Sequence, residues 1–567
     1  MSEVRNQLRV RLCLSGISWL LAMTCLPALG QSESSPKTAP SASIVAQPTD
    51  YGLFRIAGTV VNAATGGPLR RATVAALAIV DSRTVATTET DSQGHFALER
   101  LPAAKYQLTA SKRGFRTAFY DEHGEFNTAI VTGTDQETGN IVFWFTPGAV
   151  LRGLVTADGG DPVERAQVIL FRKPNDHAPG ARIALAGAAD TDDSGAYEFA
   201  NLEAGEYLLA VKAEPWYALH RLNPQSRQRP ANDPSAVLDV AYPLTFFDSA
   251  TEEAEAAPIL LAGGARVEAD IGLHAVPALH IAVEIPRAQD GKPSPAEPSL
   301  RQRIFGQQVL SEAFPSPGDP REPTVEFGGI APGHYELTQE DPPRIVDLDA
   351  TASQTVDSTL GSPAVAVSGT LRTASDSAPD EDVTMALESM DRERRRNSLE
   401  AICKQGSFSF PLVPPGNWEL WAESSGTPLP IAEIALGKQS YAGNQVQVRD
   451  RPLSIAVTLS SRETRIEGFA RRDGKGVAGA MLVLVPKDTG AMRAFARRDQ
   501  SDSDGSFAFG NVAPGLYTIV AIQDGWELDW ARPEVIARYL PGGISVTVTD
   551  TSGKLLRLSE PVSVRAR

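Results

Sequence analysis

One hydrophobic spacing recurs five times along this chain of 567 residues. Counted from its first aromatic or aliphatic residue, each copy has apolar residues at 0, +2, +5, +10 and +12. Side chains two residues apart lie on one face of a strand, so each copy predicts two half-buried strands and an internal repeat. The copies are Phe96, Leu98, Leu101, Tyr106, Leu108; Tyr197, Phe199, Leu202, Tyr207, Leu209; Val325, Phe327, Ile330, Tyr335, Leu337; Phe408, Phe410, Val413, Trp418, Leu420; and Phe507, Phe509, Val512, Tyr517, Ile519.

A turn and a preceding strand accompany this spacing. Four copies have Ala-Gly or Pro-Gly at +7 and +8, residue pairs that favour a turn, whereas the first copy has Ala103-Ala104. The third copy lacks the central glycine that the strand upstream of the other copies carries, so its upstream half is degenerate. Those glycines are Gly58, Gly153, Gly369 and Gly468.

The copies recur at the spacing of small domains, which predicts about five β-sandwiches in tandem. The second would carry a long loop, 214–242, of a length that often has a function. In the fifth, residues 525–540 are expected to hold a short helix with Pro533 in its first turn. The predicted parts are a signal peptide 1–30, a disordered Ser/Pro/Ala-rich spacer 31–50, and sandwiches 51–148, 149–277, 278–362, 363–462 and 463–567.

The first thirty residues indicate export. Arg5, Arg9 and Arg11 precede an apolar run that ends in small residues at Gly30, the pattern of a secretory signal peptide. A membrane anchor is the alternative, but Pro27 interrupts a run that is close to the lower limit for spanning. No later segment is apolar enough to cross a bilayer, so we expect no membrane span in the mature chain.

The net charge limits the classes of partner, and the cysteine content limits the disulfides that the chain can form. Cleavage after residue 30 would leave 50 basic and 68 acidic side chains, a net charge of −18, which argues against nucleic acid as a partner. Cys403 would be the single remaining thiol, so an internal disulfide is impossible. Without a visible histidine partner, Cys403 is expected to be a small buried or edge residue rather than a reactive one.

The glycine-centred strand, the D-x-x-G-x-[FY] turn and the L-x-[PA]-G-x-Y hairpin resemble the carboxypeptidase regulatory-like domain. That domain is a transthyretin-like Greek-key β-sandwich, similar also to Cna-B and starch-binding-like sandwiches. The resemblance covers most of residues 51–567. It implies an all-β tandem array of non-catalytic modules, of a type common in secreted proteins of soil bacteria such as acidobacteria.

The acidic turns DSQG, DDSG and DSDG raise the alternative of bound calcium, above all at Asp502 and Asp504. Two observations favour a plain turn: no glutamate stands at the distance that an EF-hand needs, and the third and fourth copies keep the hairpin without the acids. Asp, Ser and Gly also suit tight turns. We therefore expect no cofactor and no metal.

Catalytic motifs are absent from the sequence. It contains no H-E-x-x-H, no G-x-S-x-G and no G-x-x-x-x-G-K, and its seven histidines are scattered. We therefore expect no enzymatic activity and no catalytic residues.

Aromatic residues offer the better indication of binding, because sugar rings stack on exposed indole and phenol faces. Trp216 and Tyr217 begin the long loop, and Trp526 and Trp530 have the four-residue spacing of a helix face packed on a sheet. These four residues are the candidate ligand platform, with core packing as the alternative.

The sequence thus predicts an exported, non-catalytic protein that is periplasmic, on the outer surface or extracellular. Its expected role is structural or in interactions, with a cell-envelope protein or polysaccharide as partner. One alternative is carbohydrate binding through aromatic loops. Another is an accessory subunit of a peptidase or other hydrolase.

Overall fold

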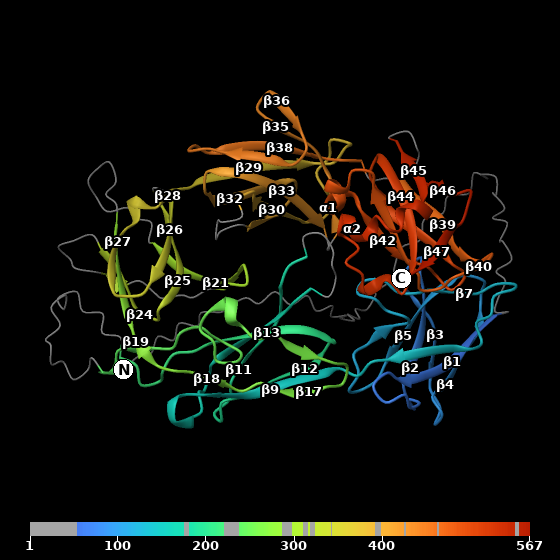
Figure 1. The fold of residues 1–567 in the computed structure, drawn as a ribbon, viewed down its shortest axis with the longest axis horizontal. Coiled ribbons are helices and arrows are strands. Elements are labelled where there is room, and N and C mark those ends of the chain that lie inside the picture. The colour runs from blue at the N-terminus through green and yellow to red at the C-terminus, as the bar shows by residue number, and fades with distance from the viewer. Residues whose placement is uncertain are drawn as a thin grey trace, which may run out of the picture. The chain divides into compact units, whose positions relative to one another are not determined.

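The computed structural model describes residues 54–174, 181–219, 237–285, 298–309, 316–317, 324–341, 343–391, 398–424, 427–461, 464–549 and 555–567. The predicted signal peptide and spacer lie outside these residues, as does the middle of the loop 214–242. Strands dominate the described residues from one end to the other, which confirms the all-β tandem array (Figure 1). The boundaries of the five sandwiches remain a proposal.

The first sandwich pairs a three-stranded sheet with a five-stranded one, and the second pairs a four-stranded sheet with a five-stranded one and adds a two-stranded sheet. The first contains β1 (Phe54–Asn62), β2 (Thr73–Ala78), β3 (Thr84–Glu89), β4 (His95–Leu101), β5 (Lys105–Ser111), β6 (Ala118–Phe119), β7 (Ile130–Val131) and β8 (Ile141–Phe145). The second contains β9 (Ala149–Thr156), β10 (Gln167–Arg172), β11 (Ala184–Asp190), β12 (Ala196–Leu202), β13 (Gly205–Lys212), β14 (Val240–Ala241), β15 (Thr245–Phe246), β16 (Ile259–Leu261), β17 (Arg266–Glu268), β18 (Ile271–Gly272) and β19 (Val276–Pro277).

The third and fourth sandwiches also have two sheets each among the described residues. The third contains β20 (Leu279–Glu284), β21 (Ser299–Ile304), β22 (Gln307–Val309), β23 (Ser316–Pro317), β24 (Thr324–Ile330), β25 (Gly333–Glu340), β26 (Pro343–Ala350), β27 (Gln354–Asp357) and β28 (Ser362–Pro363). The fourth contains β29 (Val365–Arg372), β30 (Val383–Ser389), β31 (Ser398–Cys403), β32 (Ser407–Val413), β33 (Gly416–Ser424), β34 (Thr427–Pro428), β35 (Ile431–Leu436), β36 (Gln439–Ala442), β37 (Gln445–Val448) and β38 (Leu453–Leu459).

In the fifth sandwich β47 pairs with both β39 and β44 and so joins the two layers into one nine-stranded sheet. Its strands are β39 (Thr464–Arg472), β40 (Lys475–Gly476), β41 (Met481–Pro486), β42 (Arg497–Gln500), β43 (Ser506–Val512), β44 (Gly515–Gln523), β45 (Ile544–Val548), β46 (Leu555–Arg557) and β47 (Val562–Ala566). Two short helices, α1 (Met492–Phe495) and α2 (Pro533–Ile536), lie between strands. The helix expected within 525–540 is confirmed, with Pro533 in its first turn.

The first strand of every sandwich has the same two partners. It pairs antiparallel with the strand that carries positions 0 and +2, and parallel with a strand near the end of the same sandwich. The first strands are β1, β9, β20, β29 and β39; their antiparallel partners are β4, β12, β24, β32 and β43, and their parallel partners are β8, β17, β27, β38 and β46. The sequence repeat is therefore a repeat of topology.

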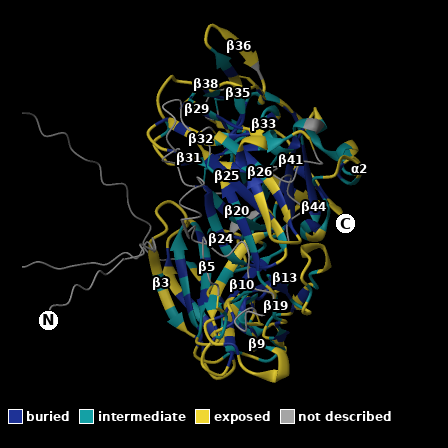
Figure 2. Cartoon of the chain, turned by 90° about the vertical axis from the view of Figure 1, so that its left-hand side faces the viewer, coloured by how far each residue is buried: buried dark blue, intermediate teal, exposed yellow. Residues whose placement is uncertain are grey.

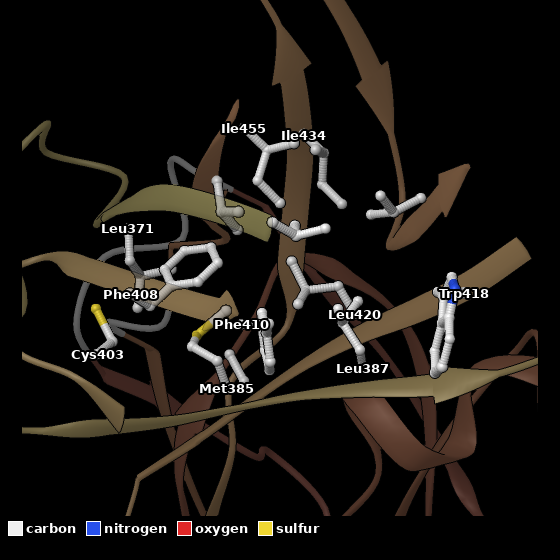
Figure 3. Close-up of a cluster of buried hydrophobic side chains, with 14 of the residues drawn as sticks. Leu371, Met385, Leu387, Cys403, Phe408, Phe410, Trp418, Leu420, Ile434 and Ile455 are labelled. Carbon is white, nitrogen blue, oxygen red and sulfur yellow. The ribbon is translucent and has the colours of Figure 1, made fainter. Parts of the chain in front are cut away.

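The repeat positions build the cores. Of the 25 apolar positions, all are buried except Leu202, which is half-buried. The five main buried clusters each lie within one proposed sandwich. Figure 2 colours the chain by burial and shows buried residues on the strands. Figure 3 shows the cluster of the fourth sandwich, where Cys403 is 1% exposed. Burial raises the pKa of its thiol, which fits the expected buried residue rather than a reactive one.

Position +10 is always Tyr or Trp, and its polar group explains why. In every copy the side chain donates a hydrogen bond to the backbone carbonyl four residues upstream. Examples are Tyr517 Oη to the Ala513 carbonyl at 2.8 Å and Trp418 Nε1 to the Pro414 carbonyl at 3.0 Å. Tyr106, Tyr207 and Tyr335 repeat the contact. A large ring thus fills the core while its one polar group stays satisfied.

The central glycine allows a close approach in the first strand. A Cβ at Gly58 would lie 1.9 Å from the Ile141 carbonyl oxygen on the parallel neighbour β8, which leaves no space for a side chain. Gly58 is also paired with the aromatic residue at position 0, Phe96. In the degenerate third sandwich both residues change together, because Val283 pairs with Val325.

Candidate functional site

The acidic turns of the first and second copies use their carboxylate to close the turn itself. Asp91 Oδ1 accepts hydrogen bonds from the backbone amides of Gln93 and His95, at 2.8 and 2.9 Å. Asp192 Oδ1 accepts from Ser194 and Ala196 in the same way. The amide hydrogen bonds hold the pKa of Asp91 below its ordinary value. The pKa of Asp192 is lowered first by a hydrogen bond from the Ser194 hydroxyl, at 2.7 Å, and then by those from the amides. Both side chains are exposed.

The corresponding turn of the fifth copy binds the first sandwich. Lys105 Nζ, on β5, donates to Asp502 Oδ2 at 2.6 Å and to Ser506 Oγ at 2.7 Å. The backbone amide of Ala129 donates to Asp502 Oδ1 at 3.1 Å. Asp504 Oδ1 accepts a hydrogen bond from the Ser506 amide at 2.9 Å and so closes the turn, as Asp91 does in the first copy. The carboxylate of Asp502 is thus directed to another sandwich.

Backbone and amide groups extend this contact. The Ser503 amide donates to the Ala129 carbonyl at 2.9 Å, and the Val131 amide donates to Ser503 Oγ at 2.8 Å. Next to them Gln500 Nε2 donates to Thr128 Oγ1 at 2.7 Å. The contact therefore joins main chain to main chain as well as charge to charge.

The contact is partly desolvated. Burial raises the pKa of Asp502, although the ammonium of Lys105 opposes the shift. Burial also raises the pKa of the adjacent Asp499 to about 6, against hydrogen bonds from two backbone amides, one of which, from Ala508, measures 2.6 Å. The stability of the fifth sandwich therefore depends on the protonation of Asp499.

This geometry bears on the calcium alternative at Asp502 and Asp504. Both Asp502 oxygens already accept hydrogen bonds from the first sandwich, one of them from a cation. Within the described ranges, no group of three or more His, Cys, Asp or Glu side chains is placed to hold a metal ion. The SDSDG segment forms the tight turn before β43, and it also contacts the first sandwich.

Trp526 lies in the contact between the first and fifth sandwiches, and Trp530 lies beside it. Neither residue is on an open face. Trp530 is 4% exposed and belongs to a cluster on the outer side of β41 and β44. Trp526 stacks on the His123 ring of the first sandwich, with centroids 4.8 Å apart and an angle of 9°. The Arg498 guanidinium lies 4.8 Å from the Trp530 ring centroid. Core packing, the alternative to a ligand platform, describes both residues in this structure, although they do not share one helix face: Trp526 lies in a 3-10 helix, Gly525–Glu527, and Trp530 follows it outside any helix.

Trp216 and Tyr217 lie on the surface of the second sandwich. Trp216 is 92% exposed. The two rings are 5.8 Å apart and nearly perpendicular, at 87°, so they do not form one flat platform. Tyr217 is half-buried and hydrogen-bonds Tyr242, whose pKa burial and this contact raise to about 12.

A further exposed indole was not predicted from the sequence. Trp144 is 60% exposed and Val142 is 44% exposed, both on β8. The strand reads IVFWF, and its alternate residues Ile141, Phe143 and Phe145 are buried. This alternation could have predicted the exposed indole from the sequence, because it places Val142 and Trp144 on the outward face.

A second junction links the second and third sandwiches. His280 on β20 lies between two carboxylates, with Nε2 2.8 Å from Asp239 Oδ2 and Nδ1 2.8 Å from Glu326 Oε1. Asp239 is almost fully buried. The contacts with Glu326 and Asp239 raise the pKa of His280 against the effect of burial.

The described residues therefore define an all-β array of repeated sandwiches that contact one another through turns and strand ends. Residues 55–138 match the carboxypeptidase regulatory-like domain family, which confirms the resemblance within the first sandwich. A comparison with curated proteins gave no match. In the part of the chain that the structure describes, no helix is long and apolar enough to span a membrane.

A comparison with solved structures found matches of low similarity. The Bacillus anthracis TIE protein is 10% identical, with 68% of each chain covered and a TM-score of 0.16. A streptococcal ancillary pilin is 12% identical, covers 49% of this chain and 98% of its own, and has a TM-score of 0.19. BcpA, the major pilin subunit of Bacillus cereus, is 8% identical, covers 55% and 99%, and has a TM-score of 0.14. At such TM-scores these likenesses support no statement about function.

Proposed function

We propose that this chain is an exported, non-catalytic protein with a structural or interaction role at the cell envelope or outside the cell. The observation that carries the proposal is the contact between the first and fifth sandwiches. The repeated acidic turn is the feature most like a ligand or metal site. In the fifth sandwich, the carboxylate of its Asp502 accepts hydrogen bonds from the first sandwich instead. We infer that the exposed turns of the other sandwiches can contact a separate protein in the same way, and a cell-envelope protein is the expected partner.

The match of residues 55–138 to a regulatory-like domain supports a module that binds or supports rather than catalyses. The net charge of the full chain, −16, favours solubility and disfavours nucleic acid as a partner. The apolar run within residues 1–30 supports export.

Carbohydrate binding is the second candidate, because Trp216 offers an almost fully exposed indole at the start of a long loop. Its perpendicular neighbour Tyr217 would contribute an edge or a hydroxyl rather than a second face. A polysaccharide partner would therefore depend on Trp216 more than on Tyr217.

A glycan array that includes peptidoglycan fragments separates the two candidates. The protein Gln31–Arg567 would be tested with and without calcium, beside the variants Trp216→Ala and Trp144→Ala. Absence of glycan binding, together with cross-links to envelope proteins in fractionated cells, is expected from the first proposal. Specific glycan binding that Trp216→Ala abolishes and Trp144→Ala preserves would replace it with the second.

A further inference from the structure

The strand β8 of the first sandwich is an edge strand without charged residues. Its sequence, IVFWF, consists of β-branched and aromatic residues, which are the types that favour strands. β8 pairs with β1 on one side, and among the described residues no strand pairs with it on the other side. Just beyond its end, Pro147 forms an isolated bridge with Phe115, so the free edge is β8 itself. An edge of this kind can accept a further strand through its backbone.

The corresponding edge is protected in the other sandwiches. In three of them the parallel partner of the first strand carries charged residues: Arg266 and Glu268 in β17, Asp357 in β27, and Arg557 in β46. In the fourth sandwich β38 is covered by its neighbour β35. Charged side chains and covering elements are common means of preventing an edge from pairing with another chain. Within the part of the chain that the structure describes, β8 has neither.

Apolar side chains also line the outward face at this edge. Val142 and Trp144 are exposed on β8, and Val61 of β1, the pairing partner of Trp144, is half-buried beside them. The alternate residues of β8 are buried in the core of the first sandwich, so the strand has a fixed outward face. A strand added at this edge would bring its own side chains against Val142 and Trp144 and remove them from water.

The sequence of β8 is complementary to a second copy of itself. When two copies pair antiparallel about Phe143, Val142 of each copy lies opposite Trp144 of the other on the outward face. An aromatic residue opposite a β-branched one is a favourable cross-strand pair, and two-fold symmetry forms this pair twice. The chain has a net charge of −16, so copies repel one another in general, but the two β8 strands bring no like charges together.

We propose that this protein forms a symmetric dimer in which the β8 strands of two copies pair antiparallel. The pairing joins the three-stranded sheets of two first sandwiches into one continuous sheet. The fifth sandwich contacts Lys105 and Val131, which belong to strands of the other, five-stranded sheet. The two contacts therefore use different sheets of the first sandwich. The dimer goes beyond the interaction role above and does not depend on it.

Sedimentation velocity of the protein Gln31–Arg567 tests the dimer without the apolar run of residues 1–30, which can associate by itself. We expect a monomer–dimer equilibrium. Trp144→Glu should raise the dissociation constant of the dimer about tenfold or more, because it removes both aromatic pairs and places a charge in the paired face. Trp216→Glu is the matched control, since it changes an exposed indole of the second sandwich and should leave the dimer intact. A protein that stays monomeric at the highest concentration reached, or a dimer that both variants affect equally, would overturn the proposal.

Disulfide trapping tests the register of the two strands. Cys403, the one cysteine of Gln31–Arg567, is buried, so cross-links between chains would come from introduced cysteines. A mixture of Val142→Cys and Trp144→Cys should cross-link, because these positions face each other across the dimer, and each variant alone should cross-link far less. Thr87→Cys on the exposed edge strand β3 is the control and should not cross-link. Cross-linking in the mixture that does not exceed that of either variant alone would contradict antiparallel pairing about Phe143.

Discussion

The turns at Asp91 and Asp502 share the D-x-x-G pattern but use their carboxylates differently. Their backbones agree: in each, the aspartate amide donates to the carbonyl four residues on, and the glycine amide donates back to the aspartate carbonyl. Asp91 closes its own turn, whereas Asp502 binds Lys105 and Ala129 of the first sandwich. The backbone pattern is thus set locally, and the role of the acid is set by what packs against the turn.

Charge reversal at Asp502 should have the largest effect. Asp502→Lys removes the partner of Lys105 and places two cations together in a partly buried contact, at a cost of about 4 kcal/mol. Calorimetric unfolding of the full chain should show the first and fifth sandwiches melting at lower temperature. The matched variant Asp91→Lys changes an exposed turn and should leave that transition in place; an equal shift in both variants would remove the distinction between the turns.

Acidification should stabilise the fifth sandwich through Asp499. Its folded-state pKa of about 6 exceeds the ordinary value of 3.8, so the folded protein binds this proton more tightly than the unfolded chain. Between pH 6 and 4 the unmodified protein should gain about 2 kcal/mol relative to Asp499→Asn. Urea unfolding of both proteins across this range measures the gain, and parallel pH curves would contradict it.

The junction at His280 should respond to pH in the same direction, but over a higher pH range. Its raised pKa means that stabilisation is complete below the ordinary value of 6.5 and is lost as pH rises through the folded value. His280→Gln should cost about 2 kcal/mol at pH 6, because two charged hydrogen bonds are lost, and less at pH 9. Thermal unfolding at both pH values tests this, and a cost independent of pH would argue against a charged His280.

The smallest effect is expected at Asp91 itself. Asp91→Asn keeps one acceptor oxygen for the amides of Gln93 and His95, so the hairpin should fold unchanged. Because the pKa of Asp91 is lowered, its contribution is present above the ordinary value of 3.8 and disappears as pH falls. Chemical shifts of the His95 amide should move with this titration in the unmodified protein only.

The sequence predicted what each repeat determines alone. Positions such as Phe96 and Tyr106 predicted the strands, the core residues and the family resemblance. The period-two pattern of burial depends on one repeat only and not on the sandwiches packed against it. Contacts between sandwiches were not predictable: Lys105 and Asp502 are far apart in the chain, and neither residue type distinguishes a docked turn from a free one. Trp526 shows the same limit, since its spacing indicated packing but not that His123 of another sandwich supplies the surface.

The SDSDG turn holds the first sandwich through the ion pair between Asp502 and Lys105. Amide hydrogen exchange at Ala129 and Val131 tests it most directly, because both amides donate to the fifth sandwich. We predict faster exchange in Asp502→Lys and in Lys105→Asp, and recovery in the double variant that exchanges the two charges. Exchange at both amides that is unchanged by either single variant would contradict the claim.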